Sequence, residues 1–352
     1  MKIVVTGATG NVGTSVLRAL AADPAVEEIV GLARRLPQWE NPRTRWVQAD
    51  VTASPLEPVF RGADAVIHLA WLIQPSRDPA TLRLVNVDGS RRVFEAAAGA
   101  GVGALVYASS IGVYSPGPKD RRVAEDHPRE GVRTSFYARH KAETERILDT
   151  VEARAADLRV VRLRPALIFK RDAASEIRRL FIGPLLPSPF VHPRLIPVLP
   201  VPPRFVLQAV HSLDVGEAYR LAATSPDARG AYNIAAEPVL DGQTIGGLVG
   251  ARVVTVPAKA VRAATLATWR ARLQPTPPGW LDMGLGVPVM DTTRAREELR
   301  WAPRHGADEA FMELLDGLRR SDGADTPPLH PHAGGPLRVK ELLTGVGKTL
   351  GL

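Results

Sequence analysis

Short apolar runs alternate along the chain with longer stretches in which apolar residues recur every three or four positions. The runs favour strands, and the stretches between them have the period of amphipathic helices. The predicted strands are residues 3–5, 29–32, 46–48, 65–69, 104–107 and 160–163. The clearest helices between them are residues 15–22, 86–99 and 137–155. This alternation predicts an α/β fold with a parallel sheet and helices on both faces.

The pattern changes after Pro165. Prolines crowd the segment between Pro184 and Pro203, which excludes central strands and helices there. We expect an irregular, largely apolar cover over the carboxyl ends of the strands, where ligands bind in such folds. Strand and helix patterns return at residues 206–235 and fade after Pro303.

The first strand runs directly into a turn with Gly7, Gly10 and Gly13, and a helical pattern follows at once. Glycine allows a tight turn and lets a pyrophosphate approach the backbone. The helix N-terminus then offers free N–H groups and the positive end of its dipole to the phosphates. This order of strand, turn and helix predicts a dinucleotide-binding, Rossmann-like, doubly wound parallel sheet.

The glycine spacing and several later motifs are similar to one known family. Tyr137 and Lys141 form a Tyr-x-x-x-Lys pair, and Ser110 precedes Val113-Tyr114 as the family's catalytic serine does. Residues 210–215, 231–234 and 291–303 resemble further family segments in the expected order. The chain thus resembles the extended short-chain dehydrogenase/reductase superfamily, the NAD-dependent epimerase/dehydratase family.

The change of pattern after Pro165 predicts a division into domains. We expect residues 1–165 plus 206–235 to form the Rossmann NAD(P)-binding domain. Residues 166–205 plus 236–320 would form a smaller C-terminal substrate-binding lobe, and residues 321–352 a linker and C-terminal tail. The resemblance also implies a homodimer in which the helices that carry Tyr137 and Asn86 pack against their copies.

The resemblance implies a catalytic triad of Ser110, Tyr137 and Lys141. Tyr137 would exchange a proton, and Ser110 would hydrogen-bond the reacting oxygen. A phenol has an ordinary pKa of ~10, and we expect the charges of Lys141 and of an oxidised nicotinamide to lower the Tyr137 pKa towards neutrality. Ser109 would point away from the site and act as a structural hydrogen-bonding residue.

Cofactor contacts are expected from residues at the ends of several strands. The glycine turn, the end of the second strand and the segments after the next strands contribute most of them. They are Gly7, Thr9, Gly10, Asn11, Val12, Gly13, Arg34, Arg35, Asp50, Val51, Leu69, Ala70, Asn86, Tyr137, Lys141 and Pro165.

The end of the second strand favours NADP over NAD, with NAD as the alternative. Enzymes that use NAD usually hold the adenosine ribose there with an acidic residue. Ala33 occupies that position here, and Arg34 and Arg35 follow it. Guanidinium groups suit a 2′-phosphate, which a carboxylate would repel.

The expected reaction is reversible hydride transfer between a nicotinamide and an alcohol or carbonyl substrate. Ile111 and Gly112 stand where a dehydratase of the family carries an acidic pair, which argues against that branch. A nucleotide-sugar epimerase remains an alternative, and several arginines could bind its diphosphate. These are Arg171, Arg178, Arg179, Arg194 and Arg204. A non-catalytic dinucleotide-binding sensor is the second alternative.

Composition and charge limit the kinds of site, partner and location that we expect for this protein. The 352 residues are 45% hydrophobic and 23% charged and include no cysteine, which excludes disulfides and Cys-ligated metals, and we expect no metal site. The net charge of +8 comes from arginines spread along the chain, so we expect no nucleic acid partner. No apolar stretch predicts a membrane span, and the first strand leaves no room for a signal peptide. We therefore expect a cytoplasmic enzyme with a small-molecule substrate.

Overall fold

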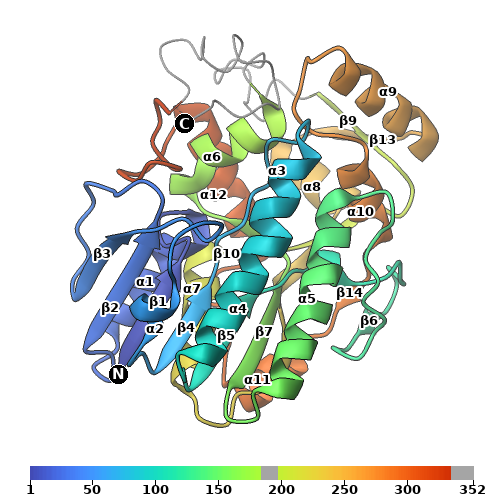
Figure 1. Ribbon diagram of the computed structural model, residues 1–352. Coiled ribbons are helices and arrows are strands. Elements are labelled where there is room, and N and C mark those ends of the chain that lie inside the picture. Colours follow the sequence, from blue (N-terminus) through green and yellow to red (C-terminus); the bar gives the residue numbers. More distant parts are fainter. Residues whose placement is uncertain (184–196, 334–352) are drawn as a thin grey trace.

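The computed structural model describes residues 1–183 and 197–333. Its centre is a seven-stranded sheet with the order β11-β7-β5-β4-β1-β2-β3, in which all neighbouring strands are parallel (Figure 1). The strands are β1 (Lys2–Thr6), β2 (Glu28–Ala33), β3 (Thr44–Gln48), β4 (Ala65–His68), β5 (Ala104–Ala108), β7 (Arg159–Pro165) and β11 (Gly230–Ile234). All six strands predicted from apolar runs lie in this sheet, so the predicted parallel α/β fold is confirmed.

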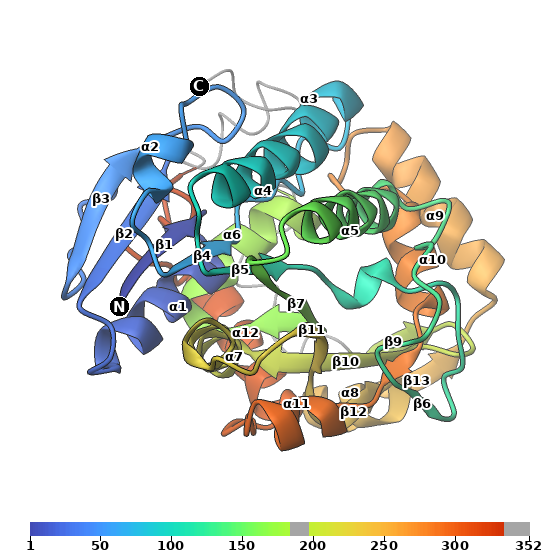
Figure 2. The same ribbon diagram turned by 60° about the horizontal axis from the view of Figure 1, so that its bottom comes forward.

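Helices cover both faces of the sheet. Figure 2 shows α2, α4 and α5 on one face and α1 and α7 on the other. Their bounds are α1 (Asn11–Ala22), α2 (Glu57–Phe60), α4 (Gly89–Gly99), α5 (Phe136–Arg154) and α7 (Ser212–Thr224). Successive side chains of β1 alternate between two cores: Ile3 and Val5 pack with α1 and α7, and Val4 packs with Phe94 and Leu148. Because both faces are covered, the central strands are mostly apolar, although β7 carries the buried Arg159, Arg162 and Arg164.

The three predicted helices are present with small changes at their starts. The helix expected at residues 86–99 begins as a π-helix, η1 (Leu84–Asp88), which continues into α4. The short helix α3 (Pro79–Arg83) precedes it, and the 3-10 turn η2 (Ile111–Val113) follows β5. No helix in the described part of the chain has the length and hydropathy of a membrane span.

Smaller sheets and short helices lie around the large sheet. Within the described residues the smaller sheets have the orders β12-β10-β8, β13-β9 and β14-β6. Their strands are β6 (Arg122–Val123), β8 (Leu167–Phe169), β9 (Val198–Val201), β10 (Val206–His211), β12 (Ala236–Asp241), β13 (Arg252–Thr255) and β14 (Val289–Met290). The remaining helices are η3 (Arg171–Ala173), α6 (Ala174–Ile177), η4 (Arg178–Ile182), α8 (Gly242–Val249), α9 (Ala258–Arg270), α10 (Gly279–Gly286), α11 (Thr293–Glu298) and α12 (Ala307–Arg320). Figure 1 shows α6 and α9 beyond the carboxyl ends of the central strands.

Residues 206–235 contribute both to the large seven-stranded sheet and to the three-stranded sheet. Strand β11 and helix α7 join the large sheet, whereas β10 pairs with β8 and β12 in the three-stranded sheet. The predicted division into a Rossmann domain and a substrate lobe stays a prediction, and the strand pairing places β10 with the second region.

The proline-rich segment is less irregular than expected. Strand β9 contains Pro200 and pairs with β13 in parallel. In a two-stranded sheet each strand keeps one free edge, and there a proline, which lacks an N–H, is tolerated. The expectation of an irregular cover is therefore wrong for β9. Residues 184–196, including Arg194, lie outside the described residues.

The expected loss of pattern after Pro303 is wrong. Helix α12 follows, with Asp308 and Glu309 in its first turn and Arg319 and Arg320 in its last. Acidic residues at the start and basic residues at the end of a helix both favour the helix dipole. The Glu309 carboxylate also accepts a hydrogen bond of 2.9 Å from the Gly306 N–H.

The predicted linker after α12 is packed against the protein. Thr326 is 1% exposed and Leu329 is fully buried. We call residues 322–333 the C-terminal segment. The rest of the predicted tail, residues 334–352, lies outside the described residues.

Candidate active site

The residues predicted to bind the cofactor and to catalyse lie along one edge of the large sheet. The glycine turn follows β1, Arg34 and Arg35 follow β2, and Asp50 and Val51 follow β3. Leu69 and Ala70 follow β4, Ser110 follows β5, and Pro165 ends β7. The carboxyl ends of parallel strands meet at this edge, which is the usual ligand-binding edge of an open α/β sheet.

The glycine turn is shaped by close backbone packing. Gly7 has a φ of +70°, and a Cβ atom there would lie 2.7 Å from the Ala70 nitrogen. A Cβ on Gly13 would lie 2.4 Å from the Gly7 oxygen, so neither position admits a side chain. At Gly10 a Cβ would meet only the Gly7 oxygen, at 3.6 Å. The turn therefore holds its shape through Gly7 and Gly13 and leaves room beside Gly10.

Helix α1 starts directly after this turn. Its N-cap is Gly10, which makes no side-chain cap, and its first turn holds no acidic residue. Free N–H groups at the positive end of a helix dipole bind phosphate well. The turn of Thr9, Gly10, Asn11, Val12 and Gly13 therefore stays the predicted site of a dinucleotide pyrophosphate, and one of its N–H groups, that of Asn11, already donates a hydrogen bond to Glu176.

Two residues that the sequence analysis did not assign to the turn also meet it. Lys170, 3% exposed, donates hydrogen bonds to the Asn11 carbonyl oxygen at 2.9 Å and to Thr14 Oγ1 at 2.6 Å. Burial lowers the pKa of Lys170 to about 8. Burial raises the pKa of the Glu176 carboxyl, although Arg179, Lys170 and a hydrogen bond from the Asn11 N–H act against this. Both residues lie after β8, where no local motif marks them.

Basic side chains follow β2, where the adenosine of the cofactor is predicted to lie. Arg34 and Arg35 are exposed. Asp50 Oδ1 accepts hydrogen bonds from Thr52 N at 2.8 Å and Thr52 Oγ1 at 2.6 Å. Burial alone would raise the pKa of Asp50, but these bonds and the charge of Arg34 bring it below its usual value. Val51 is 7% exposed and packs against Gly89.

The structure brings Ser110, Tyr137 and Lys141 together. Ser135 caps α5 by accepting a hydrogen bond from the Ala138 N–H, and Tyr137 and Lys141 follow one turn apart on one face. The side chain of Ser110 hydrogen-bonds the Tyr137 phenol. The Lys141 Nζ lies 5.7 Å from the centre of the Tyr137 ring and donates to the Ala108 carbonyl oxygen at 2.5 Å.

The expected lowering of the Tyr137 pKa includes the charge of an oxidised nicotinamide and stays a prediction. Burial raises the pKa of Tyr137 to about 12, and the hydrogen bond with Ser110 only partly offsets this. Burial also lowers the pKa of Lys141 well below its usual value, against the opposing effect of Glu145. Burial thus favours the neutral form of both side chains, and the phenol keeps its proton at neutral pH.

Ser109 has a different partner from its neighbour. Its Oγ donates a hydrogen bond of 2.5 Å to Glu145 Oε1. Arg164 Nε and Nη2 donate to the two carboxylate oxygens of the same Glu145 at 2.9 and 2.7 Å. Ser109 thus belongs to a buried ion-pair network, and Ser110 alone of the two serines meets Tyr137.

Asn86 holds the loop beside the residues predicted to be catalytic. Its Oδ1 accepts from the Leu72 N–H at 2.7 Å, and its Nδ2 donates to the Leu72 carbonyl oxygen at 2.8 Å. The preceding residue, Trp71, places its indole ring 3.5 Å from the Lys141 Nζ. Asn86 therefore positions Trp71 against Lys141.

Aromatic side chains line the site around Tyr137. The ring centres of Tyr137 and Trp280 are 4.8 Å apart, and Trp71 meets Tyr137 edge-on at 5.9 Å. Phe181 packs on Trp280 at 5.0 Å. Met283 also lies near the Tyr137 ring, with Gly112 between them. A Cβ atom added to Gly112 would lie 3.0 Å from the Met283 sulfur and 3.0 Å from the Tyr137 ring. The sequence did not point to these residues, because they come from distant segments. At Gly112 there is no room for an acidic side chain.

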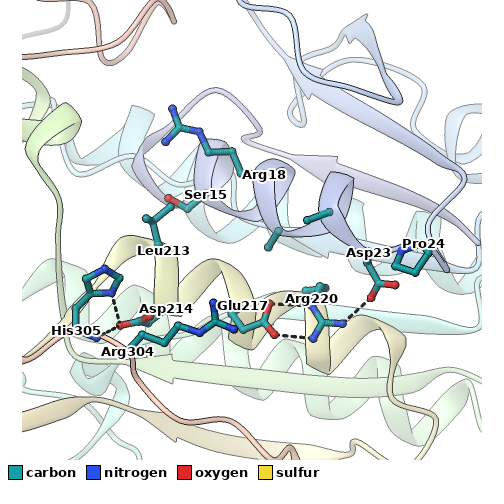
Figure 3. Close-up of a pocket in the computed structure, with 12 residues that line it drawn as sticks. Ser15, Arg18, Asp23, Pro24, Leu213, Asp214, Glu217, Arg220, Arg304 and His305 are labelled. Carbon is teal, nitrogen blue, oxygen red and sulfur yellow. Dashed lines mark hydrogen bonds and ion pairs between the residues drawn. The ribbon is translucent and has the colours of Figure 1, made fainter.

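A cavity of about 450 Å³ lies elsewhere, between α1 and α7 (Figure 3). Five of its charged side chains pair with one another: Arg220 with Asp23 at 2.5 Å and with Glu217 at 2.6 Å, and His305 with Asp214 at 3.0 Å. It holds none of the residues predicted to be catalytic. In residues 1–183 and 197–333, no group of three or more His, Asp or Glu side chains is placed to hold a metal ion.

Comparison with known proteins identifies a family and a fold. The family model described as NAD dependent epimerase/dehydratase family matches residues 3–181. An uncharacterized protein of Mycobacterium bovis is 26% identical over 322 residues, which are 91% of this chain, and the chain spans only 30% of that relative's length. Human 3 beta-hydroxysteroid dehydrogenase type 7 is 35% identical over 152 residues, 40% of this chain and 41% of that protein.

A solved structure supports the fold over most of the chain. The structure of MoeE5 in complex with UDP-glucose and NAD covers 91% of this chain and 99% of its own, with a TM-score of 0.68 and 22% identity. At this identity the likeness concerns the fold alone.

Proposed function

The chain belongs to the NAD dependent epimerase/dehydratase family, and we propose that it is a nicotinamide-dependent oxidoreductase that interconverts an alcohol and a carbonyl compound. One observation carries the proposal. Ser110 hydrogen-bonds Tyr137 at the same sheet edge as the glycine turn, with Lys141 one helical turn away. The three side chains have the chemistry that proton exchange with a reacting oxygen requires.

The proposed roles follow from the contacts of each side chain. A bound nicotinamide would donate or accept the hydride. The Tyr137 phenol, with a pKa of about 12 in the protein alone, holds a proton that it can donate to a carbonyl oxygen. Ser110 orients that oxygen by a hydrogen bond. Lys141 lies between Trp71 and the Ala108 carbonyl, where it can hold the nicotinamide ribose and adjust the phenol pKa.

The surroundings of Tyr137 favour a substrate with an apolar body. Trp71, Trp280, Phe181 and Met283 offer ring faces and a thioether rather than polar groups. The partial relative named as a human hydroxysteroid dehydrogenase agrees with an apolar alcohol or ketone. A screen of alcohols and ketones that follows the absorbance of the reduced nicotinamide would test this, and activity confined to sugar nucleotides would contradict it.

The cofactor is proposed to be NADP(H). Arg34→Ala is expected to weaken NADP(H) binding by ~1.5–3 kcal/mol, as for hydrogen bonds to a charged group. NAD(H) binding should be unchanged, because NAD(H) lacks the 2′-phosphate. Calorimetric titration of both dinucleotides measures this directly, with NAD(H) as the internal control. Tighter binding of NAD(H) than NADP(H) to the unaltered protein would refute the preference.

A nucleotide-sugar epimerase is the alternative enzyme. The likeness to MoeE5, whose structure contains UDP-glucose and NAD, favours it. At least three of the arginines considered for a diphosphate already have partners: Arg171 pairs with Asp316 at 2.9 Å, Arg179 donates to the Pro328 carbonyl oxygen, and Arg204 donates to the Gly117 carbonyl oxygen at 3.1 Å. Net epimerisation of a sugar nucleotide without consumption of added cofactor would favour the epimerase. A dinucleotide sensor, the second alternative, would bind cofactor and turn over nothing.

A homodimer is proposed from the family resemblance. Helices α4 and α5 lie side by side on one face of the sheet (Figure 2), and they are the pair expected to form a four-helix contact with a second copy. Light scattering at micromolar concentration should give twice the mass of the chain. A monomer under these conditions would contradict the proposal.

A further inference from the structure

Trp280 lies beside Tyr137 because the starts of two helices pack closely. Helix α10 begins at Gly279 and lies beside α5 (Figure 1). A Cβ atom on Gly279 would overlap the Thr134 carbonyl oxygen and lie 2.9 Å from the Ser135 Cα, so this approach requires glycine. The next residue, Trp280, then places its ring centre 4.8 Å from that of Tyr137. Close backbone packing therefore fixes an indole beside the phenol that we propose to react.

Hydrogen bonds join the segments that form the aromatic wall around Tyr137. The Gln74 Nε2 donates to the Leu180 carbonyl oxygen at 2.9 Å and to the Pro275 carbonyl oxygen at 3.2 Å. The Thr276 Oγ1 donates to the Phe181 carbonyl oxygen at 2.7 Å. Three segments that are far apart in the sequence are thus tied directly to one another. Such ties favour a fixed position for the aromatic rings that these segments carry.

Two indole N–H groups of this wall have no partner. The Nε1 atoms of Trp71 and Trp280 are buried, and neither has a hydrogen-bond partner among the described residues. The Trp301 Nε1, by contrast, donates to the Asp214 carbonyl oxygen at 2.8 Å. A buried donor without an acceptor costs free energy, so each such group calls for a ligand or a water that accepts from it. A substrate bound at Tyr137 can supply that acceptor.

The two indoles have different neighbours. The Trp71 ring centre lies 3.5 Å from the Lys141 Nζ, the group proposed to hold the nicotinamide ribose. The Trp280 ring instead packs on Tyr137 and meets Phe181 edge-on at 5.0 Å. These contacts place Trp71 with the cofactor and leave the indole of Trp280 for the substrate.

We propose that Trp280 is a specificity-determining residue whose indole N–H donates a hydrogen bond to a second oxygen of the substrate. The inference rests on the proposed interconversion of an alcohol and a carbonyl compound, and it narrows the substrate class. The substrate is an apolar ketone or alcohol that carries a further carbonyl, hydroxyl or ether oxygen near the reacting carbon. Its reacting oxygen meets Tyr137 and Ser110, its second oxygen meets Trp280, and its apolar body packs on the rings. A compound without the second oxygen leaves the indole N–H buried and unpaired, which slows its reaction.

The test compares pairs of apolar ketones that differ only in one further carbonyl or ether oxygen, placed at graded distances from the reacting carbon. The kcat/KM values are measured with NADPH or NADH, whichever the unaltered protein accepts. The unaltered protein should favour the best oxygenated ketone about 10- to 100-fold over the ketone without the second oxygen. Trp280→Phe keeps an aromatic ring but no N–H, and it should reduce this ratio to about one to three.

Trp46→Phe is the matched control. The Trp46 Nε1 is also buried without a partner among the described residues, but Trp46 lies on β3, the edge strand of the large sheet. Its replacement removes the same kind of N–H group and should leave the ratio of the two kcat/KM values unchanged.

A second measurement does not depend on turnover. In a proton–nitrogen correlation spectrum each of the six tryptophans gives an indole N–H signal, and Trp280→Phe identifies the Trp280 signal by its loss. With the oxidised cofactor present, so that no ketone is reduced, the oxygenated ketone should shift this signal more than the ketone without the second oxygen.

Three results would overturn the role of Trp280. They are equal kcat/KM values for both members of every pair in the unaltered protein, an unchanged ratio in Trp280→Phe, and a Trp280 indole signal that neither ketone shifts. If the dinucleotide binds but no ketone of any pair is reduced, the proposed function itself is contradicted instead.

Discussion

Tyr137→Phe is expected to abolish turnover while leaving the affinity for the cofactor almost unchanged. The substitution removes one hydroxyl, which is the group proposed to exchange a proton with the substrate. The ring can keep its packing against Trp71 and Trp280, so the fold should be preserved. Loss of a general acid–base group typically costs ~10²–10⁴ in rate. Steady-state kinetics together with calorimetric titration of NADPH measure both effects.

A matched control is available in the same core. Tyr107 is 1% exposed, and its ring centre lies 5.2 Å from the Lys141 Nζ. Tyr107→Phe removes a buried phenol hydroxyl from the neighbourhood of Lys141 but none that we assign to the reaction, so its activity should stay near that of the unaltered protein. Near-normal turnover by Tyr137→Phe on any accepted substrate would show that the proposed triad is wrong.

The other two members of the triad should give different patterns. Ser110→Ala should retain partial activity, down by ~10²–10³-fold, the usual loss for one positioned hydrogen-bond donor. Lys141→Ala should damage both turnover and cofactor affinity, because Lys141 is proposed to serve the ribose as well as the phenol. The same two measurements separate these outcomes from a general loss of structure.

Arg164→Met is expected to destabilise the fold by about 3–5 kcal/mol. Arg164 and Glu145 form a bidentate ion pair, and their side chains are 3% and 0% exposed. Removal of Arg164 would leave the Glu145 carboxylate buried with only Ser109 and the more distant Arg129 as partners. An uncompensated buried charge is costly because the protein interior solvates it poorly. Urea unfolding followed by circular dichroism measures the loss.

Two further variants test whether this loss of stability comes from the buried, unpaired charge. Arg83→Met breaks an exposed pair with Glu143 and should cost less than about 1 kcal/mol. The double variant Arg164→Met, Glu145→Leu should be more stable than Arg164→Met alone, since no charge is left behind. Equal, small losses in Arg164→Met and Arg83→Met would contradict the account of the buried pair.

The buried ion pair of Arg164 and Glu145 predicts that the stability of the fold depends on pH. Burial would raise the pKa of Glu145, but the hydrogen bonds and charge of Arg164 hold it below its usual value. A carboxyl whose pKa is lower in the folded state stabilises the fold above its ordinary pKa, and this stability is lost as the pH falls through the lowered value. The difference in stability between the unaltered protein and Arg164→Met should therefore shrink on acidification below the usual carboxyl range.

The sheet and its glycine turn could be predicted because they are local patterns. Most central strands contain a short apolar run buried on both faces, and the conformations of Gly7 and Gly13 follow from backbone packing that only glycine allows. Helix α12 could also have been predicted, since Asp308, Glu309, Arg319 and Arg320 mark its two ends.

Other features depend on contacts that the sequence does not show. Trp71 and Trp280 meet at Tyr137 only because separate segments converge there. The polar composition of the C-terminal segment resembles a linker, yet Thr326 and Leu329 are buried. The burial that raises the pKa of Tyr137 in the protein alone is likewise not visible in the sequence.

The central claim is hydride transfer between a nicotinamide and a carbonyl compound at Tyr137. The most direct measurement supplies NADPH that carries deuterium at the transferable position, together with ketones that have apolar bodies, and analyses the alcohols by mass spectrometry. The account predicts deuterium on the carbinol carbon with the unaltered protein and none above background with Tyr137→Phe. If the dinucleotide binds but no deuterium reaches any carbonyl compound, the claim is contradicted.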